Sequence, residues 1–286
     1  MDRVFLSTLL ILLLGAGSIP EVEASADRVP TLVLWYQSVG APLPGEDFGH
    51  FLSRVAQARM GTAYSGASES TVTEELALEI DRFECVSLLE SSLAVARCAW
   101  RGEPTEGCFV WEILGLRYRS GLMGNFASRL HYFIDWLEDN EGRWRLKNLT
   151  AELGGQPLGR DFYYITQHAA MAPALALPGV RRSMAAIERD LSSRQHVVLQ
   201  RNDVRGALDA MRDGDLIAIV GNKPGRLVMH AGLIARQEGE RARLLHASSY
   251  HRRVVVTRED VAAYVMRRPE RTGVIVARPL PPKKSQ

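Results

Sequence analysis

Cysteine and histidine are the side chains in this chain best suited to covalent or acid–base chemistry. Cys85 begins a segment whose apolar residues recur at helical spacing, so its thiol should lie in the first turn of a helix. Backbone N–H groups and the positive end of the helix dipole favour an anion there, which would lower the thiol pKa. A thiolate at this place could attack a carbonyl, and the same N–H groups could bind the resulting oxyanion. The competing interpretation is a buried, inert cysteine.

Two histidines lie in neighbouring apolar segments near the C-terminus, residues 226–236 and 244–249. If the turn between the segments centres on Glu238, antiparallel pairing sets His230 directly opposite His246. Opposed residues share one face of a sheet, with Cβ atoms about 4.5–5.5 Å apart. His246 could then orient His230, and a helix docked on that face would bring a thiol to His230, as in a catalytic triad. The competing interpretation is a structural pair of histidines.

The cysteine count indicates how the thiols are used. The chain holds three cysteines, so at least one stays unpaired in an oxidising compartment. Cys98 and Cys108 are the pair expected to form a disulfide, closing a short loop across residues 102–104. Cys85 then remains a free thiol, which in such a compartment is a liability unless it is buried or used.

The elements that would position these residues predict an α+β fold. The expected helices cover residues 48–60, 85–100, 182–191 and 258–266. The expected strands cover residues 216–220, 226–236, 244–249, 253–257 and 273–278. The last third is therefore an antiparallel meander that follows a helix. Residues 61–66 are expected as a turn, Pro178 and Gly179 as part of a loop, and residues 101–205 as an insertion of mixed structure that walls one side of a cleft.

The N-terminal residues 1–26 are typical of a signal peptide. A positive charge precedes an apolar run at residues 4–14, and Ala24-Ser25-Ala26 fits a signal-peptidase site. The run is shorter than the roughly 20 residues needed to span a bilayer, so a retained anchor is the competing interpretation. We expect an exported protein, periplasmic or secreted, without stable membrane insertion after cleavage. Residues 27–286 should form a single domain, and we expect a monomer.

Composition narrows the functional classes. Hydrophobic residues at 46% and charged residues at 24% are ordinary globular values and argue against disorder. A net charge of +2 gives no case for nucleic acid as a partner. No His-Glu-x-x-His segment and no close group of ligand spacing is present, so we expect neither a metal nor another cofactor.

The ordered set of motifs resembles the NlpC-type branch of papain-like cysteine peptidases and amidases, which remodel bacterial peptidoglycan. Its pattern is matched by Tyr64 in a Gly-rich turn, Glu84-Cys85, His230-Ala231-Gly232-Leu233 and Leu245-His246-Ala247-Ser248. More narrowly, the chain resembles the N-acetylmuramoyl-L-alanine amidase-like subfamily. The matching segments are Gly61-Thr62-Ala63-Tyr64, Phe83-Glu84-Cys85-Val86, Leu89-Glu90, Tyr118-Arg119, Ser128-Arg129-Leu130-His131-Tyr132, Asp135-Trp136 and Arg271-Thr272-Gly273.

The resemblance implies a papain-like core and a role for each matching residue. Cys85 would be the nucleophile, His230 the general base and His246 the orienting third member, while Tyr64 would approach the oxyanion or support the thiol. The implied substrate is a peptidoglycan fragment, cleaved at the muramoyl–L-alanine amide. Glu84 departs from the family, which usually has Asp before the cysteine; the longer carboxylate could cap the helix less well or lean toward the sulfur and raise the thiol pKa.

The insertion offers candidate substrate ligands in Arg119, Arg129 and His131. A guanidinium is a planar fork that suits a carboxylate, such as those on a stem peptide. The alternative is that an arginine pairs with Asp135 or Glu138 and holds the insertion together. The histidines expected to be structural or on the surface are His50, His168, His196 and His251.

Three other functions stay open at this point. Many relatives in the superfamily are endopeptidases that cut between D-glutamate and a diamino acid, and the sequence does not separate that bond from the muramoyl amide. A zinc amidase would need a third ligand beside His230 and His246, and none is evident. A non-catalytic wall-binding module would usually have lost the thiol or a histidine, and this chain keeps all three.

Overall fold

The computed structural model describes residues 28–66, 71–236 and 239–283, so the expected signal peptide lies outside the described residues. The helices are α1 (Arg28–Val39), α2 (Phe48–Gln57), α3 (Cys85–Arg101), α4 (Glu106–Arg117), α5 (Phe133–Gly142), α6 (Tyr164–Gln167), α7 (Pro178–Ser193), α8 (Val204–Ala207) and α9 (Val261–Met266). The strands are β1 (Ala63–Tyr64), β2 (Arg82–Phe83), β3 (Leu146–Asn148), β4 (Gln156–Gly159), β5 (Gln195–Gln200), β6 (Leu216–Gly221), β7 (Val228–Ala235), β8 (Arg243–Ser248), β9 (Arg253–Asp260) and β10 (Arg271–Pro279). Across these ranges, every helix is too short or too polar to span a membrane.

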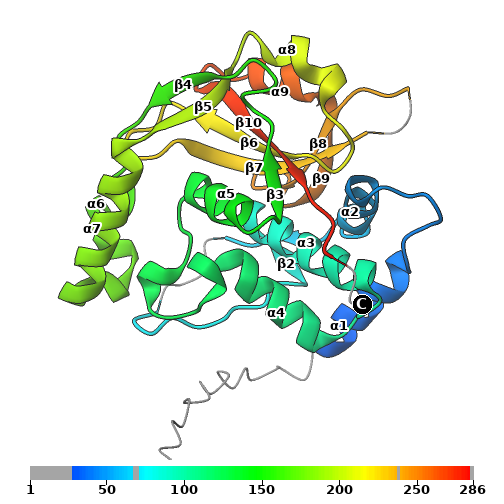
Figure 1. Ribbon diagram of the computed structural model, residues 1–286, viewed down its shortest axis with the longest axis horizontal. Coiled ribbons are helices and arrows are strands. Elements are labelled where there is room, and N and C mark those ends of the chain that lie inside the picture. The colour runs from blue at the N-terminus through cyan, green and yellow to red at the C-terminus, as the bar shows by residue number, and fades with distance from the viewer. Residues whose placement is uncertain (1–27, 67–70, 237–238, 284–286) are drawn as a thin grey trace, which may run out of the picture.

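The strands form one ten-stranded sheet in the order β2-β1-β9-β8-β7-β6-β10-β5-β4, with β3 also paired to β10. The pairs from β9 to β10 are antiparallel, as the meander predicted, whereas β1 and β2 are parallel to each other. The sheet lies above α3, α4 and α5, with α8 and α9 on its other side (Figure 1). The α+β expectation is therefore confirmed at the level of a sheet with helices on both faces.

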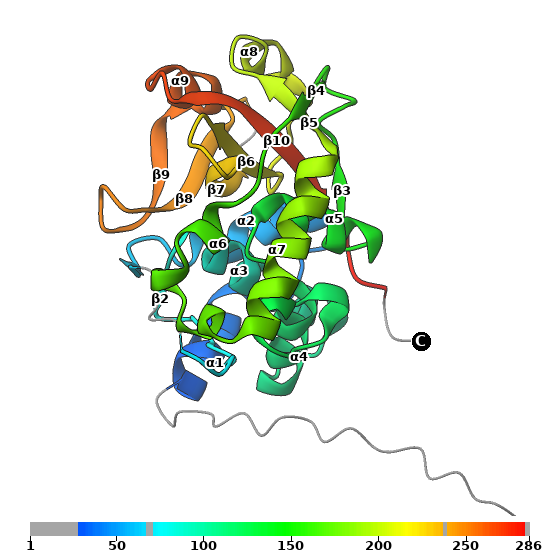
Figure 2. The same cartoon turned by 90° about the vertical axis from the view of Figure 1, so that its left-hand side faces the viewer.

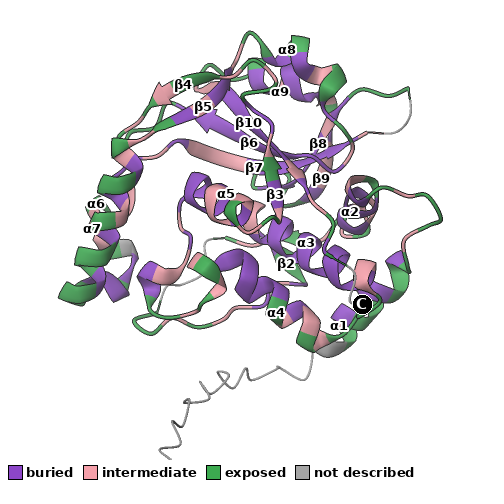
Figure 3. Cartoon of the chain, viewed as in Figure 1, coloured by how far each residue is buried: buried purple, intermediate pink, exposed green. Residues whose placement is uncertain are grey.

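The two faces of the sheet belong to two hydrophobic clusters. In β6, Leu216, Ala218 and Val220 pack into the larger cluster with α2, α3 and α5, while Ile217 and Ile219 pack into a smaller cluster with α8 and α9. This alternation follows from the period of two in a strand and explains why β6 is buried over its whole length. Figure 3 shows the same burial running through the sheet and into α3.

Helix α3 runs through the middle of the larger cluster. It packs against α2 and α4 as well as against β7 and β8, so nearly all of its residues are buried. The helix ends at Gly102, whose φ of 79° is the left-handed conformation that glycine adopts without a Cβ clash. Just before this turn, Cys98 forms a disulfide with Cys108 of α4, with a Cα–Cα separation of 6.0 Å. The disulfide ties the C-terminal end of α3 to α4.

Residues 101–205 differ from the expected covering layer. Their strands β3 and β5 pair with β10, and β4 extends the sheet from β5, so this stretch contributes to the core. Figure 2 shows β4 and β5 at the upper edge of the sheet, above the long helix α7. The prediction missed these strands because they are short and their partner, β10, lies far away in the sequence.

Three local expectations were also wrong in their boundaries. Residues 63–64 form a short strand where a turn was expected, because they pair with both β2 and β9. Pro178 lies in the first turn of α7, a position that needs no backbone N–H, so the expected loop is a helix start. Strand β9 continues to Asp260, whose carboxylate accepts from Ala263 N–H at 2.7 Å and caps α9 three residues later than expected.

Candidate active site

Cys85 is the first residue of α3, and Glu84 before it caps the helix. The Glu84 carboxylate accepts from Ser87 N–H at 2.7 Å, and the Ser87 hydroxyl accepts from Glu84 N–H at 3.0 Å, which is a reciprocal capping box. The other carboxylate oxygen lies 3.4 Å from the Cys85 sulfur. Glu84 therefore does both things that the sequence left open: it caps the helix and leans toward the thiol.

The environment of the Cys85 thiol opposes ionisation. Burial and the neighbouring Glu84 carboxylate raise the pKa of the Cys85 thiol well above its usual value, whereas backbone N–H groups of Ala231 and of Cys85 itself act in the opposite direction. The sequence offered two opposite influences on this pKa, the helix terminus that would lower it and Glu84 that could raise it. Desolvation and the carboxylate one residue away outweigh the helix dipole.

The contact with Ala231 N–H shows where α3 meets the sheet. Ala231 lies next to His230 in β7, so the sulfur at the start of α3 is held against the strand that carries this histidine. The described pairs between β7 and β8 run from Leu233–Leu245 to Ala235–Arg243. Both histidines thus lie beyond the last β7–β8 pair, at the end of this ladder that lies nearest to the Cys85 sulfur.

The histidines hydrogen-bond to each other, but not in the predicted register. His230 Nε2 and His246 Nδ1 are 2.7 Å apart, and the rings meet edge to face at 4.8 Å between centroids. The observed pairing of Leu233 with Leu245 centres the hairpin on Gly239, with φ of 75°, and not on Glu238, which lies outside the described residues. This shift sets the histidines diagonally across the two strands. Long side chains still meet across such a diagonal.

Gly232 makes the diagonal contact possible. A Cβ atom on this residue would lie 2.5 Å from the Leu245 carbonyl oxygen and 3.0 Å from the His246 Cβ. Since glycine carries no side chain, the His246 side chain occupies that space and reaches His230, which lies two residues before Gly232 in β7. The glycine of the His-x-Gly motif therefore has a steric role in joining the histidines.

The histidines also lie on the opposite sheet face from the one expected to bind the helix. His230 is paired with Ile219, which belongs to the smaller cluster, and His246 contacts Tyr264 of α9 at 5.6 Å between ring centroids. Helix α3 packs on the other face. The expected docking was therefore wrong, because the thiol meets β7 at the end of a ladder and does not approach across a face.

Burial keeps both histidines neutral. It lowers the pKa of His230 to about 3, with the neighbouring His246 and Arg271 acting in the same direction. Burial also lowers the pKa of His246 to about 4, again with help from the Arg271 charge. In the resting site the thiol is therefore protonated and both imidazoles are neutral, so the hydrogen bond between the two rings needs one donor and one acceptor nitrogen.

Tyr64 reaches the thiol through the parallel pairing of β1 and β2. Tyr64 is opposite Phe83, so its side chain comes to the start of α3. Burial, the Cys85 thiol and Glu84 raise the pKa of the Tyr64 hydroxyl, while Arg252, stacked on its ring at 5.3 Å, opposes the shift. Of the sequence-predicted residues, the structure brings Tyr64 to Cys85 and joins His230 to His246, and the Cys85 sulfur meets the strand of His230 at Ala231.

Tyr264 was missed by the sequence reasoning. It contacts His246 and carries the Arg271 guanidinium 3.8 Å above its ring. Burial raises the pKa of the Tyr264 hydroxyl, and the Cys85 thiol and Glu259 add to the shift. The available signal was its place in the predicted C-terminal helix, but only the packing of α9 on the sheet brings it to the histidines.

Each of the three insertion residues has a partner within the protein. Arg119 binds Asp135 through two nitrogens, one at 2.9 Å, as the structural alternative expected. Arg129 donates to Glu74 at 2.7 Å, a partner that the sequence reasoning did not consider. His131 stacks on Phe126, and burial lowers the pKa of its imidazole to about 4. Of the other histidines, His196 is buried against the Leu191 carbonyl oxygen, at 3.0 Å.

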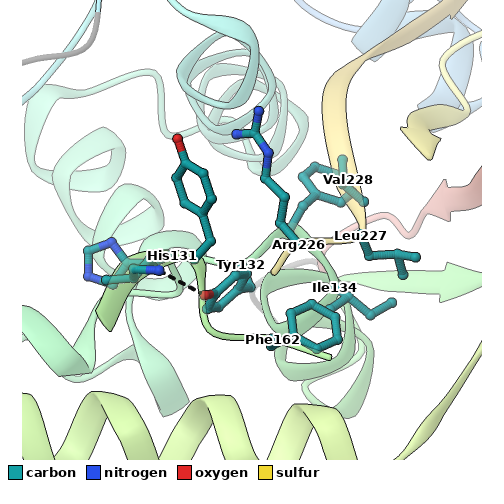
Figure 4. Close-up of a pocket in the computed structure, with 10 residues that line it drawn as sticks. His131, Tyr132, Ile134, Phe162, Arg226, Leu227 and Val228 are labelled. Atoms are coloured by element: carbon teal, nitrogen blue, oxygen red, sulfur yellow. Dashed lines mark hydrogen bonds between the residues drawn. The ribbon is translucent and has the colours of Figure 1, made fainter. Parts of the chain in front are cut away.

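Two cavities are lined by chain neighbours of these residues: one by Glu84 and Val86 on either side of Cys85, the other by the segment from Arg226 to Val228 that precedes His230. One, of about 450 Å³, is lined by Glu84, Val86 and Tyr64 together with Arg129 and His131. The other, of about 210 Å³, is lined by residues just before His230 in β7 and by residues of the insertion, His131 again among them (Figure 4). The larger volume is within the range of small-molecule sites. In the described part of the chain, no three His, Cys, Asp or Glu side chains come together as metal ligands.

Comparisons with known proteins place the chain in a family. The model of the AmiA-like family, described as N-acetylmuramoyl-L-alanine amidase-like, matches residues 54–274. The chain is similar to an N-acetylmuramoyl-L-alanine amidase from Bacteroides uniformis ATCC 8492, at 26% identity and a TM-score of 0.75, over 81% of this chain and 98% of that one.

Two further solved structures are similar. A putative xylanase from Bacteroides fragilis has 30% identity and a TM-score of 0.72 over 78% of this chain and 98% of that chain. A protein from Legionella pneumophila shares the fold, with 16% identity and a TM-score of 0.66 over 90% of this chain and 96% of that chain. No curated protein matches the sequence.

Proposed function

Because the chain belongs to the AmiA-like family of N-acetylmuramoyl-L-alanine amidase-like proteins, we propose that it hydrolyses the amide between muramic acid and L-alanine in muropeptides. The observation that carries the proposal is the contact of one free thiol with β7, the strand whose His230 is hydrogen-bonded to His246 of β8. A nucleophile, a base and an orienting group are the parts that cysteine amide hydrolysis needs.

In the first half of the proposed reaction, Cys85 attacks the lactyl carbonyl carbon. Its thiol gives the proton to His230, whose Nε2–H is donated to His246 Nδ1, so that the other ring nitrogen is the free base. The tetrahedral oxyanion would accept from N–H groups at the start of α3, with Tyr64 close by. Collapse breaks the carbon–nitrogen bond, and the L-alanine nitrogen leaves as an amine after taking the proton from His230.

In the second half, water hydrolyses the thioester. His230 takes a proton from the water as its oxygen attacks, and the Cys85 sulfur leaves and is reprotonated by the imidazolium. The products are a muramic acid carboxylate and a stem peptide that begins with L-alanine. Because the thiol is protonated and the imidazole neutral at rest, proton transfer accompanies attack in this scheme, as in general-base catalysis.

The rest of the proposal concerns architecture and compartment. We infer an NlpC-type papain-like core, in which a helix with the nucleophile at its start packs on an antiparallel sheet, as α3 packs on β7 and β8. We propose that residues 1–26 direct export to the periplasm or beyond, and that residues 27–286 act as one monomeric domain. A disulfide between Cys98 and Cys108 is consistent with an oxidising compartment.

The decisive experiment is incubation of residues 27–286 with soluble muropeptides, with products read by mass spectrometry. Free stem peptides beginning with L-alanine are expected, and C85A should reduce turnover by about 10³-fold or more because the nucleophile is gone. H230A should have a comparable effect, whereas H246A should retain more activity because it removes only the orienting group. Thermal unfolding of each variant controls for loss of fold.

Other outcomes assign other functions. Cleavage inside the stem, between D-glutamate and the diamino acid, would keep the cysteine mechanism and change the bond. Full activity of C85A would overturn the cysteine assignment, and loss of activity on addition of a chelator would point to a metal amidase. No cleavage by the unaltered protein would favour a wall-binding module.

A further inference from the structure

Arg226 lies at the entrance of the strand that carries the proposed base. It is two residues before Val228, the first residue of β7, and lines the 210 Å³ cavity that Val228 also lines. In Figure 4 its side chain extends away from Leu227 and Phe162, with the guanidinium at the outer end. This cavity therefore has an arginine within four residues of His230 along the same stretch of chain.

The Arg226 guanidinium has no acidic partner among the described residues. Its contact is with the Tyr164 ring, whose centroid lies 4.7 Å from the guanidinium carbon, and its buried Nε lacks a hydrogen-bond acceptor. Arg119 and Arg129, the two arginines that the sequence singled out, are both bound to carboxylates. Unlike Arg119 and Arg129, Arg226 could thus bind a substrate carboxylate without displacing an acidic partner.

The surroundings of the cavity reinforce this charge. The side chains that line it include no carboxylate, and the nearby imidazole of His131 is neutral because burial lowers its pKa to about 4. The nearby buried carboxylate of Glu188 is hydrogen-bonded within the protein: it accepts from the Tyr132 hydroxyl at 2.6 Å and from Ile165 N–H at 3.0 Å. Arg226 is consequently the one charged side chain among the residues that line the cavity.

We propose that Arg226 binds a carboxylate of the stem peptide and thereby selects muropeptides whose second residue has a free α-carboxylate. This specificity rests on the function proposed above. In a stem that begins L-alanine–D-glutamate, linked through the γ-carboxyl, the α-carboxylate of the second residue is the first acidic group beyond the scissile amide. An arginine fork binds such a group through two parallel hydrogen bonds, whereas an amide in its place would lose the charge and present a donor.

The test compares two substrates that differ only at this group: N-acetylmuramoyl-L-alanyl-D-glutamate and N-acetylmuramoyl-L-alanyl-D-isoglutamine, whose α-carboxyl is an amide. The unaltered protein should cleave the carboxylate substrate with about 10- to 100-fold higher kcat/KM, mostly through KM, which is the range of one charge-assisted hydrogen bond. R226Q should lose most of this preference, and R226K should retain part of it because the charge remains. R182Q, a variant of an exposed arginine on α7, should keep the full preference.

The outcomes separate the two proposals. Cleavage of both substrates with equal kcat/KM, or a preference that persists in R226Q, would overturn the role of Arg226 while the amidase function stands. Failure of the unaltered protein to cleave either substrate would overturn both. R226K serves as the second variant, since retention of the preference there and its loss in R226Q would exclude a general folding defect.

Discussion

The two ends of α3 treat polar groups in opposite ways. At the N-terminal end, burial keeps the Cys85 thiol protonated and the two histidines neutral. Toward the C-terminal end, Glu112 of α4 is a buried carboxylate bound by Arg97 at 2.9 Å and Arg101 at 2.6 Å, and also by Arg145. The thiol and the imidazoles at one end can still exchange protons, whereas the carboxylate at the other end is bound by three guanidinium groups.

This difference separates groups available for chemistry from groups committed to structure. A carboxylate bound by three guanidinium groups has no free capacity for a substrate, and removing it would leave buried positive charges without compensation. A neutral imidazole can still accept a proton. The same criterion distinguishes Arg226 from Arg119 and Arg129, whose charges are already paired.

The largest expected effect on stability comes from removing the Glu112 carboxylate that the three arginines share. Although burial alone would raise it, the guanidinium groups of Arg97 and Arg145 hold the pKa of the Glu112 carboxyl below its usual value. E112Q should therefore lower the free energy of unfolding by about 3–5 kcal/mol, measured by chemical denaturation. Activity per folded molecule should be unchanged. The exposed pair of Arg243 with Glu240 is the control: E240Q should cost less than about 1 kcal/mol, and equal losses would contradict the comparison.

An intermediate effect on stability is expected when acid protonates the buried His246. The folded-state pKa of His246 is about 4, below the unfolded value of about 6.5, so the unfolded chain binds the proton first as the pH falls. The stability that this histidine contributes is present above pH 6.5 and is lost as the pH falls toward 4. By pH 5 the loss should be about 1–2 kcal/mol.

Denaturation curves at pH 7 and pH 5 would measure this loss. The variant H246N should show a smaller difference between the two pH values, because the titrating group is gone. H168Q, which removes an exposed histidine, should follow the unaltered protein. An identical pH dependence in H246N would show that acid destabilises the fold at some other group.

The smallest effect concerns the carboxylate beside the thiol. E84Q should lower the pKa of Cys85, because it removes a negative charge that disfavours the thiolate while the amide oxygen can still cap Ser87. Alkylation by iodoacetamide at pH 7.5 should then be roughly 3- to 10-fold faster, in keeping with a shift of about one pKa unit or less. With the disulfide intact, Cys85 is the single free thiol of the chain. E152Q, which alters an exposed acid, should leave the rate unchanged.

Much of the site could be predicted from local sequence. The helical stripe after Cys85 fixed the start of α3, the apolar runs fixed β6, β7 and β8, and the cysteine spacing indicated the bond between Cys98 and Cys108. These features depend on periodicities and short loops, which involve residues close in the chain. The pairing of the two histidines followed from the same hairpin, although its register was two residues off.

Only the tertiary structure decided which charged side chains are paired within the protein and which can bind a substrate. Arg129 is bound by Glu74, 55 residues away, whereas Arg226 has no acidic partner in the described part of the chain. The pKa of Cys85 likewise depends on burial beneath distant strands and not on its helix terminus. Sequence determines side-chain chemistry and local periodicity, but partners and desolvation arise from contacts between remote segments, and these set the charge of every group in the site.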